Sequence, residues 1–360
     1  MNTPGGPPCS CRRPPLTILL LVCLAALVIP QVCWTPEWPA GPVELEGEVC
    51  VWPSQTYFFV KGPWGKAAAT IPPGVEIKAG QKVKIWGRWS TPEGTFAHWL
   101  RGSGALGWIY SNSVIVTDDS QPLLVRPFEW LRLAVKGRLG HPIPQAMLLG
   151  DRNVVPKDMI ELFDRTGTSH LLAASGLHLS IVVSLLAVVT SKKWPILLVA
   201  LLYVVLTGGK VGMVRSAIML TLSFAKLPLS KWQRLLIALI AILIIWPYSV
   251  WSVSLWLSFV STAAVLLVSP LLRRIRGWYS YPVRIAITST VCQIAALPIV
   301  FYTFGRVAFP VCIPANIWAI PVGTVVLSAA FLSFLPVVGP LAGKLSVLAA
   351  QLLVWGLNLL

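Results

Sequence analysis

The chain has 360 residues, of which 56% are hydrophobic and 12% carry a formal charge. Its mean hydropathy of +0.74 exceeds what the core of a water-soluble protein needs, so the composition excludes an ordinary soluble globular fold and predicts a polytopic α-helical membrane protein. Lysine and arginine outnumber aspartate and glutamate by 29 to 13, which gives a net charge of +16.

All acidic residues lie in the first half of the chain. No Asp or Glu follows Asp164, whereas fourteen basic residues lie between Arg165 and Leu360. Ion-coupled transporters usually need carboxylates within the membrane to bind protons or sodium, and this region has none. An exclusively cationic membrane region suits an anionic passenger, although loop charges that fix the topology also explain many of these residues.

The start of the chain predicts a membrane anchor. Residues 1–15, rich in proline and glycine, are interpreted as a cytoplasmic tail, and residues 16–34 as a transmembrane anchor or an uncleaved signal with the amino terminus inside. With this orientation, the basic residues between the later apolar runs fall on the cytoplasmic side, as the positive-inside rule requires. Lys210 and Arg306 are the two exceptions.

Residues 41–120 change character. Short runs of alternating polar and apolar residues are separated by turn signals such as GPWG, PPG and PEG, which predicts about five strands in a small OB-like β-barrel outside the membrane. Aromatic and basic residues stand together here, as on single-strand-binding surfaces. The candidates are Lys82, Lys84, Trp86, Arg88, Trp89 and Trp108. Alternatively, the aromatic residues fill the barrel core or a membrane-interface girdle, because the module is nearly balanced in charge.

Residues 124–165 are predicted to form amphipathic, interfacial helices. Residues 126–140 place apolar side chains among arginines and lysines, a pattern that suits the membrane surface. Four carboxylates follow, and helix capping and pairing with nearby basic residues explain them better than cation binding does: Asp151, Asp158, Glu161 and Asp164. The seven cysteines form no C-x-x-C pair, so no metal site is predicted.

Residues 166–360 predict a multi-helix transmembrane domain. The run from Leu171 to Thr190 is long enough to span a bilayer, while several later apolar runs are shorter and suggest broken or re-entrant helices. Polar residues crowd the start of the first run: His170, Ser175, Gly176 and His178. They either line a pore or form a satisfied polar cluster where helices cross.

Ser175 and His178 are three residues apart and could share a hydrogen bond, as in a hydrolase. No acid follows Asp164 to orient the imidazole, and the chain has no G-x-S-x-G motif, so we assign no catalytic residue and expect neither enzyme activity nor a cofactor. Three more polar residues in apolar segments are pore candidates: Arg215, which either snorkels or faces a cavity, Gln293 and Asn316.

Several motifs resemble the ComEC family of competence proteins. The matching pieces are LLGDR at 148–152, GTSHLLAASGLHL at 167–179, VRSAIM at 214–219, SLWLSFVS at 254–261, QIAALPIVFYTFG at 293–305 and NIWAIPV at 316–322. The resemblance implies an OB-like module outside the membrane, followed by a competence-type membrane domain over residues 166–360. Many relatives also carry a metallo-β-lactamase-like nuclease domain, whose H-x-H-x-D-H cluster is absent from this sequence.

The resemblance further implies a channel or translocation component that carries single-stranded DNA across the cytoplasmic membrane in natural competence. The implied partners are single-stranded DNA, the lipid bilayer, a separate nuclease, a DNA receptor or helicase, and further copies of the chain. Two alternatives stay open. The protein is a transporter of small anions or metabolites, or it is a remnant of the family that transports nothing.

Overall fold

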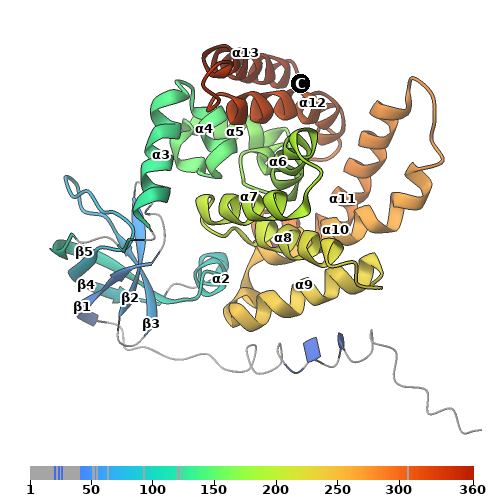
Figure 1. Cartoon of the computed structure of the whole chain (residues 1–360). Helices are drawn as coiled ribbons and strands as arrows, with labels where there is room; N and C mark the ends of the chain where they lie inside the picture. The colour runs from blue at the N-terminus through green and yellow to red at the C-terminus, as the bar shows by residue number, and fades with distance from the viewer. Residues whose placement is uncertain are drawn as a thin grey trace, which may run out of the picture.

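The computed structural model describes residues 20–21, 23–24, 26, 41–50, 53, 56–62, 65–91, 94–119, 122–123, 125–305 and 308–360. The predicted cytoplasmic tail and nearly all of the predicted anchor lie outside these residues, as does Arg306. Figure 1 shows a β-barrel beside a larger helical region, with the chain passing from the first to the second through α3.

The barrel confirms the predicted OB-like fold. Its strands are β1 (Gly41–Val49), β2 (Tyr57–Gly62), β3 (Gly65–Thr70), β4 (Lys82–Ser90) and β5 (Ala105–Asp118), and they close in the order β1-β2-β3-β5-β4. Every pair is antiparallel except β3 with β5. Alternation places one face of each strand inside, where Phe58, Val60, Val83, Ile85 and Ile109 are almost fully buried.

One helix of the barrel was not predicted. α2 (Gly94–Gly102) lies in the connection between β4 and β5. Its Leu100 is 2% exposed and packs with Ala68 and Ala105 on the outer surface of β3 and β5. The carboxyl end of α2 also contacts η3 (Pro247–Trp251), so the helix lies between the barrel and the helical region (Figure 1).

The segment predicted to be interfacial forms α3 (Arg126–Arg138), α4 (Pro142–Leu149), η1 (Arg152–Val154) and α5 (Lys157–Arg165). α3 keeps an exposed apolar side, with Trp130 70% and Leu133 61% exposed. α4 differs from its predicted surface position, because six of its eight residues are buried. Its sequence PIPQAMLL is apolar on nearly every side, and a helix of that kind is stable only when it is surrounded.

The helical region then follows with η2 (Ser169–Leu171), α6 (Gly176–Val189), α7 (Lys193–Leu206), α8 (Val211–Phe224), α9 (Lys231–Ile245), α10 (Val253–Leu272), α11 (Ser280–Phe304), α12 (Cys312–Leu332) and α13 (Gly339–Asn358). Within the described residues, α10 to α13 are the four helices long and apolar enough to cross a membrane. α6, α7 and α8 are shorter apolar helices.

The predicted span from Leu171 to Thr190 is wrong at its start. Helix α6 begins at Gly176, because the residues before it form η2 and an extended link in which Ser175 has φ −135° and ψ 177°. α12 is one continuous helix that contains Pro321.

Two buried clusters organise the helical region, and α8 belongs to both. Met213 and Ala217 pack into a large cluster that includes α4, α6, α12 and α13. Val214 and Ile218, on the other side of α8, pack against α9, η3 and α10. A polar side chain on α8 between these two faces therefore lies where the two clusters meet.

Candidate functional site

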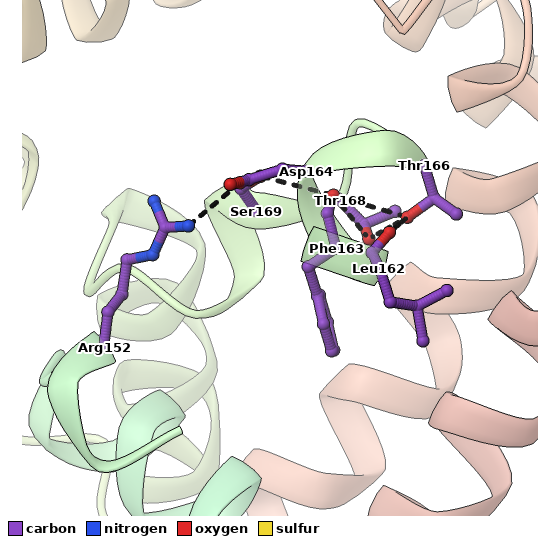
Figure 2. A network of polar contacts seen from close by, with 7 residues as sticks. All are labelled: Arg152, Leu162, Phe163, Asp164, Thr166, Thr168 and Ser169. Atoms are coloured by element: carbon purple, nitrogen blue, oxygen red, sulfur yellow. Dashed lines mark hydrogen bonds and ion pairs between the residues drawn. The ribbon is translucent and has the colours of Figure 1, made fainter. Parts of the chain in front are cut away.

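The turn before the predicted site is fixed by its own hydroxyl groups, as Figure 2 shows. The Thr166 hydroxyl donates to the Leu162 carbonyl at 2.9 Å and lies 2.8 Å from the Thr168 hydroxyl. Ser169 donates to the Phe163 carbonyl at 3.2 Å. These side-chain bonds add to the backbone N–H groups of Thr166 and Thr168, which the Leu162 and Phe163 carbonyls also accept. The buried ring of Phe163, which is 0% exposed, anchors the turn in the core.

An ion pair ties this turn to the LLGDR motif. The Arg152 guanidinium lies 2.9 Å from the Asp164 carboxylate, which also accepts a hydrogen bond from the Ser169 hydroxyl (Figure 2). Gly150 ends α4 with φ 68°, and a side chain there would place a Cβ 2.6 Å from the Ala174 Cβ. Gly150 and Arg152 of the motif thus hold the chain before α6.

His178 is part of a helix cap. Its Nδ1 accepts the Ser175 backbone N–H at 3.3 Å and lies 3.0 Å from the Ser175 hydroxyl, while Nε2 lies 3.1 Å from the Leu171 carbonyl oxygen. A carbonyl only accepts, so Nε2 carries the hydrogen and the imidazole is neutral. The side chain is 1% exposed. Both ring nitrogens are used, which favours the polar helix-crossing interpretation of His178 over pore lining.

Gly176 brings α8 close to the start of α6. A Cβ built on this glycine would lie 2.5 Å from the Ser216 hydroxyl and 2.9 Å from Nη2 of Arg215. Ser175 and Gly176 are both half-buried and face α8, whereas His170 is exposed on η2. Only the Ser175–Gly176 part of the predicted polar group therefore meets Arg215.

Arg215 lies between the two buried clusters and binds neutral groups. Its Nε donates to the Ser258 hydroxyl at 2.9 Å, Nη1 donates to the Thr262 hydroxyl, and Nη2 donates to the Ser216 hydroxyl at 3.2 Å. The Phe259 ring lies 6.0 Å from the guanidinium carbon. We call Gly176, Arg215, Ser216, Ser258 and Thr262 the Arg215 cluster.

The Arg215 cluster is positive without a carboxylate. The described ion pairs within residues 41–50, 65–91, 94–119 and 125–305 include none to Arg215, and the sequence has no acid after Asp164. The amino end of α6, next to the guanidinium, adds the partial positive charge of its free N–H groups. Guanidinium groups bind phosphate oxygens strongly, so this arrangement attracts an anion.

Gln293 and Asn316 lie apart from the Arg215 cluster, at a second helix seam, which is the contact between α11 and α12. Asn316, which is 5% exposed, donates to the Ser289 hydroxyl at 3.2 Å and joins α12 to α11. The Gln293 amide nitrogen would lie 3.4 Å from a Cβ on Gly167, in the turn before η2. The structure thus separates the predicted pore residues into a group on α6 and α8 and a group on α11 and α12.

The predicted single-strand-binding residues of the barrel also fall into two groups, one on the outer surface and one in the core. Lys82, Lys84, Trp86 and Arg88 alternate on the outer face of β4, and Trp108 lies on the outer face of β5. Trp89 is 5% exposed and packs in the barrel core, because its position on β4 has the opposite parity. This tryptophan has no face open to a base, as the barrel-core alternative states.

Acids neutralise most of the basic strip on β4. Glu44, Glu46 and Glu48 of β1 stand opposite Trp86, Lys84 and Lys82 in the strand register. Lys84 Nζ lies 2.5 Å from the Glu44 carboxylate, and this hydrogen bond lowers the pKa of Glu44. Lys82 pairs with Asp118 at 3.7 Å. The strip therefore offers a phosphate little free positive charge.

Sequence reasoning missed the junction between the barrel and the helices. Arg132 of α3 is 8% exposed; its Nη2 lies 3.5 Å from the Asp151 carboxylate and its Nη1 donates to the Leu206 carbonyl at 2.9 Å. Burial raises the pKa of Tyr57 on β2, and the charge of Asp151 raises it further. Asp151 also opposes the lowering of the pKa of Lys210 by burial. Lys210, one of the two exceptions to the positive-inside rule, thus lies near the Asp151 carboxylate.

Replacing Asp151 with alanine is expected to lower the free energy of unfolding by about 3–5 kcal/mol, because the buried Arg132 would lose its ion pair with that carboxylate. The measurement is thermal unfolding of the purified chain in lipid nanodiscs. Asp158→Ala removes an exposed carboxylate of α5 and serves as the matched control. Equal effects of the two substitutions would contradict the importance of the Arg132–Asp151 pair.

The fold and the site together define a helical membrane protein with an OB-like barrel and a cationic cluster among its helices. A family model described as "Competence protein" matches residues 147–360. The match covers more than half of the chain, and the protein therefore belongs to the competence protein family.

The chain is similar in sequence to two curated proteins. The chain is 29% identical to "ComE operon protein 3" of Bacillus subtilis (strain 168) over 192 residues, which are 50% of this chain and 24% of that protein. It is 32% identical to "Uncharacterized protein YcaI" of Escherichia coli (strain K12) over 137 residues, 33% of this chain and 18% of that protein. The matched regions thus cover a quarter or less of either relative. No solved structure matches.

Proposed function

We propose that this protein takes part in DNA uptake during competence, as a multi-pass component of the cytoplasmic membrane that carries single-stranded DNA. The observation that carries the proposal is the Arg215 cluster, where a guanidinium is held by three neutral hydroxyl groups in a region without carboxylates. Membership of the competence protein family supports the same process.

The chemistry of the cluster suits a passing polymer. A phosphate can exchange for the hydroxyl partners of Arg215 without breaking an ion pair, because no carboxylate competes for the guanidinium. A conducting site must bind its passenger well enough to admit it and weakly enough to release it. A single arginine with neutral neighbours meets both requirements better than a dense basic groove. Contacts of this kind act on the backbone and read no sequence.

The cluster alone fits a small anion as well as a phosphate polymer, and transport measurements separate the two. The full chain is reconstituted in vesicles with fluorescent single-stranded oligo-dT, double-stranded DNA of equal length, or radiolabelled inorganic phosphate outside. We expect oligo-dT to become protected from added nuclease, with little protection of the duplex. Phosphate entry without DNA entry would identify a small-anion transporter, and entry of neither would identify a remnant.

The proposal has a defined topology and set of partners. The barrel lies on the outer side, and Lys192 and Lys193 lie on the cytoplasmic side. A nuclease that produces single strands, a DNA receptor, a helicase and further copies of this chain are the proposed partners. Cysteine labelling of Ser113→Cys on the barrel and Lys192→Cys in whole cells would place these residues on opposite sides.

A further inference from the structure

A group of six aromatic rings covers one outer face of the barrel. They come from three elements: Tyr57 and Phe59 of β2, Phe96 and Trp99 of α2, and Trp108 and Tyr110 of β5. We call this surface the aromatic face. It lies over β2, β5 and α2, whereas the basic residues predicted to bind DNA lie on β4.

The rings form one continuous surface. Phe96 stacks on Trp99 with centroids 5.4 Å apart and meets Trp108 edge-on at 5.2 Å. Trp99 contacts Tyr57 at 5.5 Å, and Trp108 contacts Tyr110 at 6.4 Å. These separations are typical of favourable aromatic pairs, so the rings support one another in fixed positions.

Part of this surface is open. Phe96 is 39% exposed, Trp99 37% and Tyr110 55%. The barrel core is complete without these three residues, because it is filled from the inward-facing side of the strands. An exposed group of large rings on a small barrel commonly marks a contact with a partner.

Two positive charges border the aromatic face, while the negative charge of Asp151 acts on its Tyr57 end. Lys66 lies 4.4 Å from the Phe59 centroid and donates to the Ser103 carbonyl at 2.7 Å. Arg88 is exposed, and its cross-strand neighbours are Pro42 and the aromatic-face residue Tyr110, which carry no charge. Glu44, Glu46 and Glu48 lie on β1, which pairs with β4 on one side and with β2 on the other, where Glu48 stands opposite Lys61.

The position of the aromatic face in the fold also indicates a nucleic-acid partner. OB-folds bind oligonucleotides on the surface of strands two and three and through the connections between strands one and two and between strands four and five. Here β2 supplies two of the rings, and α2 forms the connection between β4 and β5. Aromatic rings bordered by cations suit bases joined by phosphates.

We propose that the aromatic face is the surface on which single-stranded DNA stacks its bases before it reaches the helical region; this inference rests on the proposed function. One electrostatic interaction and one packing contact connect it to the helices. Tyr57 lies near Asp151 at the junction, and Gly102 at the end of α2 packs so tightly on Ser252 that a Cβ would lie 2.6 Å from the Ser252 Cα. A strand released from this face therefore meets the side of the helical region that carries Lys210 and, further along α8, Arg215.

The test measures the affinity of the full chain in lipid nanodiscs for fluorescent oligo-dT, and for an abasic oligonucleotide of the same length and charge. The variant Trp99→Leu/Tyr110→Ala removes two exposed rings and keeps an apolar side chain where α2 packs. The matched control, Lys82→Ala/Lys84→Ala, removes two charges from the β4 strip. Near-ultraviolet circular dichroism and size-exclusion chromatography verify that each variant is folded.

We expect the ring variant to bind oligo-dT about tenfold or more weakly, because stacking contributes substantially for each base. The control should change the affinity less than about twofold, in keeping with its neutralised charges. The unmodified chain should prefer oligo-dT over the abasic strand, and the ring variant should lose that preference. A single variant, Tyr110→Ala, gives a smaller loss in the same direction and serves if the double variant fails to fold.

Other results would overturn the inference. If the unmodified chain binds dT and abasic strands equally, phosphates alone are recognised and the aromatic face is not the site. If the ring variants bind dT normally but associate less with protein-free vesicles, the rings are a membrane anchor. If the chain transports DNA in vesicles while the ring variants keep full affinity, the proposed function stands and this surface does not. If the unmodified chain neither binds nor transports DNA, the proposed function itself fails.

Discussion

Replacing Arg215 with methionine is expected to reduce the uptake of single-stranded DNA about ten- to a hundredfold. A hydrogen bond to a charged group contributes about 1.5–3 kcal/mol, and the loss of one such contact to phosphate corresponds to a change of that size in affinity or rate. Methionine keeps a long, flexible apolar side chain between α8 and α10 but removes the charge.

The fold should tolerate this substitution. Two of the hydroxyl groups that bind Arg215 have backbone acceptors of their own: Ser216 donates to the Gly212 carbonyl at 2.9 Å and Thr262 to the Ser258 carbonyl at 2.8 Å. Neither hydroxyl is left without a partner when the guanidinium is removed. Membrane insertion and the unfolding midpoint should therefore remain close to those of the unmodified chain.

Two further variants make the test specific. Arg276→Met removes an exposed arginine from the same helical region of the chain. We expect this variant to leave DNA uptake within about twofold, because exposed charges contribute little to binding. Arg215→Lys keeps the charge but not the forked geometry and should retain part of the uptake. The assay is nuclease protection of oligo-dT in vesicles. Unchanged uptake by Arg215→Met would remove this residue from the DNA path.

Replacing His178 with alanine is expected to lower the free energy of unfolding by about 2–4 kcal/mol. The imidazole binds the buried Leu171 carbonyl and the half-buried Ser175 N–H, and both groups would lose this partner. The start of α6 and the link before it would loosen together. Thermal unfolding in nanodiscs, followed by tryptophan fluorescence, measures this loss directly.

The substitution His178→Gln separates the structural role from a role in the path. The protein already contains a cap with glutamine at the same position, because Gln233 accepts the Ser230 N–H at 2.9 Å at the start of α9. Glutamine at 178 should therefore recover the Ser175 half of the lost stability. If His178 instead lines the path, both substitutions would abolish uptake equally while leaving stability unchanged.

Local sequence patterns predicted the strands and helices of this protein more reliably than they predicted which elements pack together. Alternation predicted the barrel, because inward and outward positions follow directly from the period of a strand. The apolar run at 171–190 misled, because composition does not show that the His178 cap starts the helix at Gly176. α2 was missed because a nine-residue helix in a connection has little pattern of its own, and its stability comes from packing on β3, β5 and η3.

For the candidate site, the sequence indicated which residues are unusual but not which of them are in contact. Ser175, Gly176 and Arg215 stand out in the sequence because polar groups are expensive in an apolar segment. Nothing local shows that Gly176 faces Arg215 or that Asn316 belongs to another seam with Ser289. The barrel residues predicted to bind a single strand stay a prediction, but the sequence did not show that Trp89 is buried or that carboxylates pair with Lys82 and Lys84.

The amino-acid pattern alone was enough to predict a membrane protein with a small barrel and a transmembrane region that carries positive charge and no carboxylate. These properties depend on composition and on the short repeat of apolar residues along a strand or helix. Both can be recognised within a single segment, without knowing what the segment packs against. Which of these charges remain without a carboxylate partner depends on how the chain folds. The register of β1 against β4 places glutamates beside Lys82 and Lys84, while helix packing brings Arg215 to hydroxyl groups 43 and 47 residues away. Electrostatic interactions act through space, and the fold sets those distances.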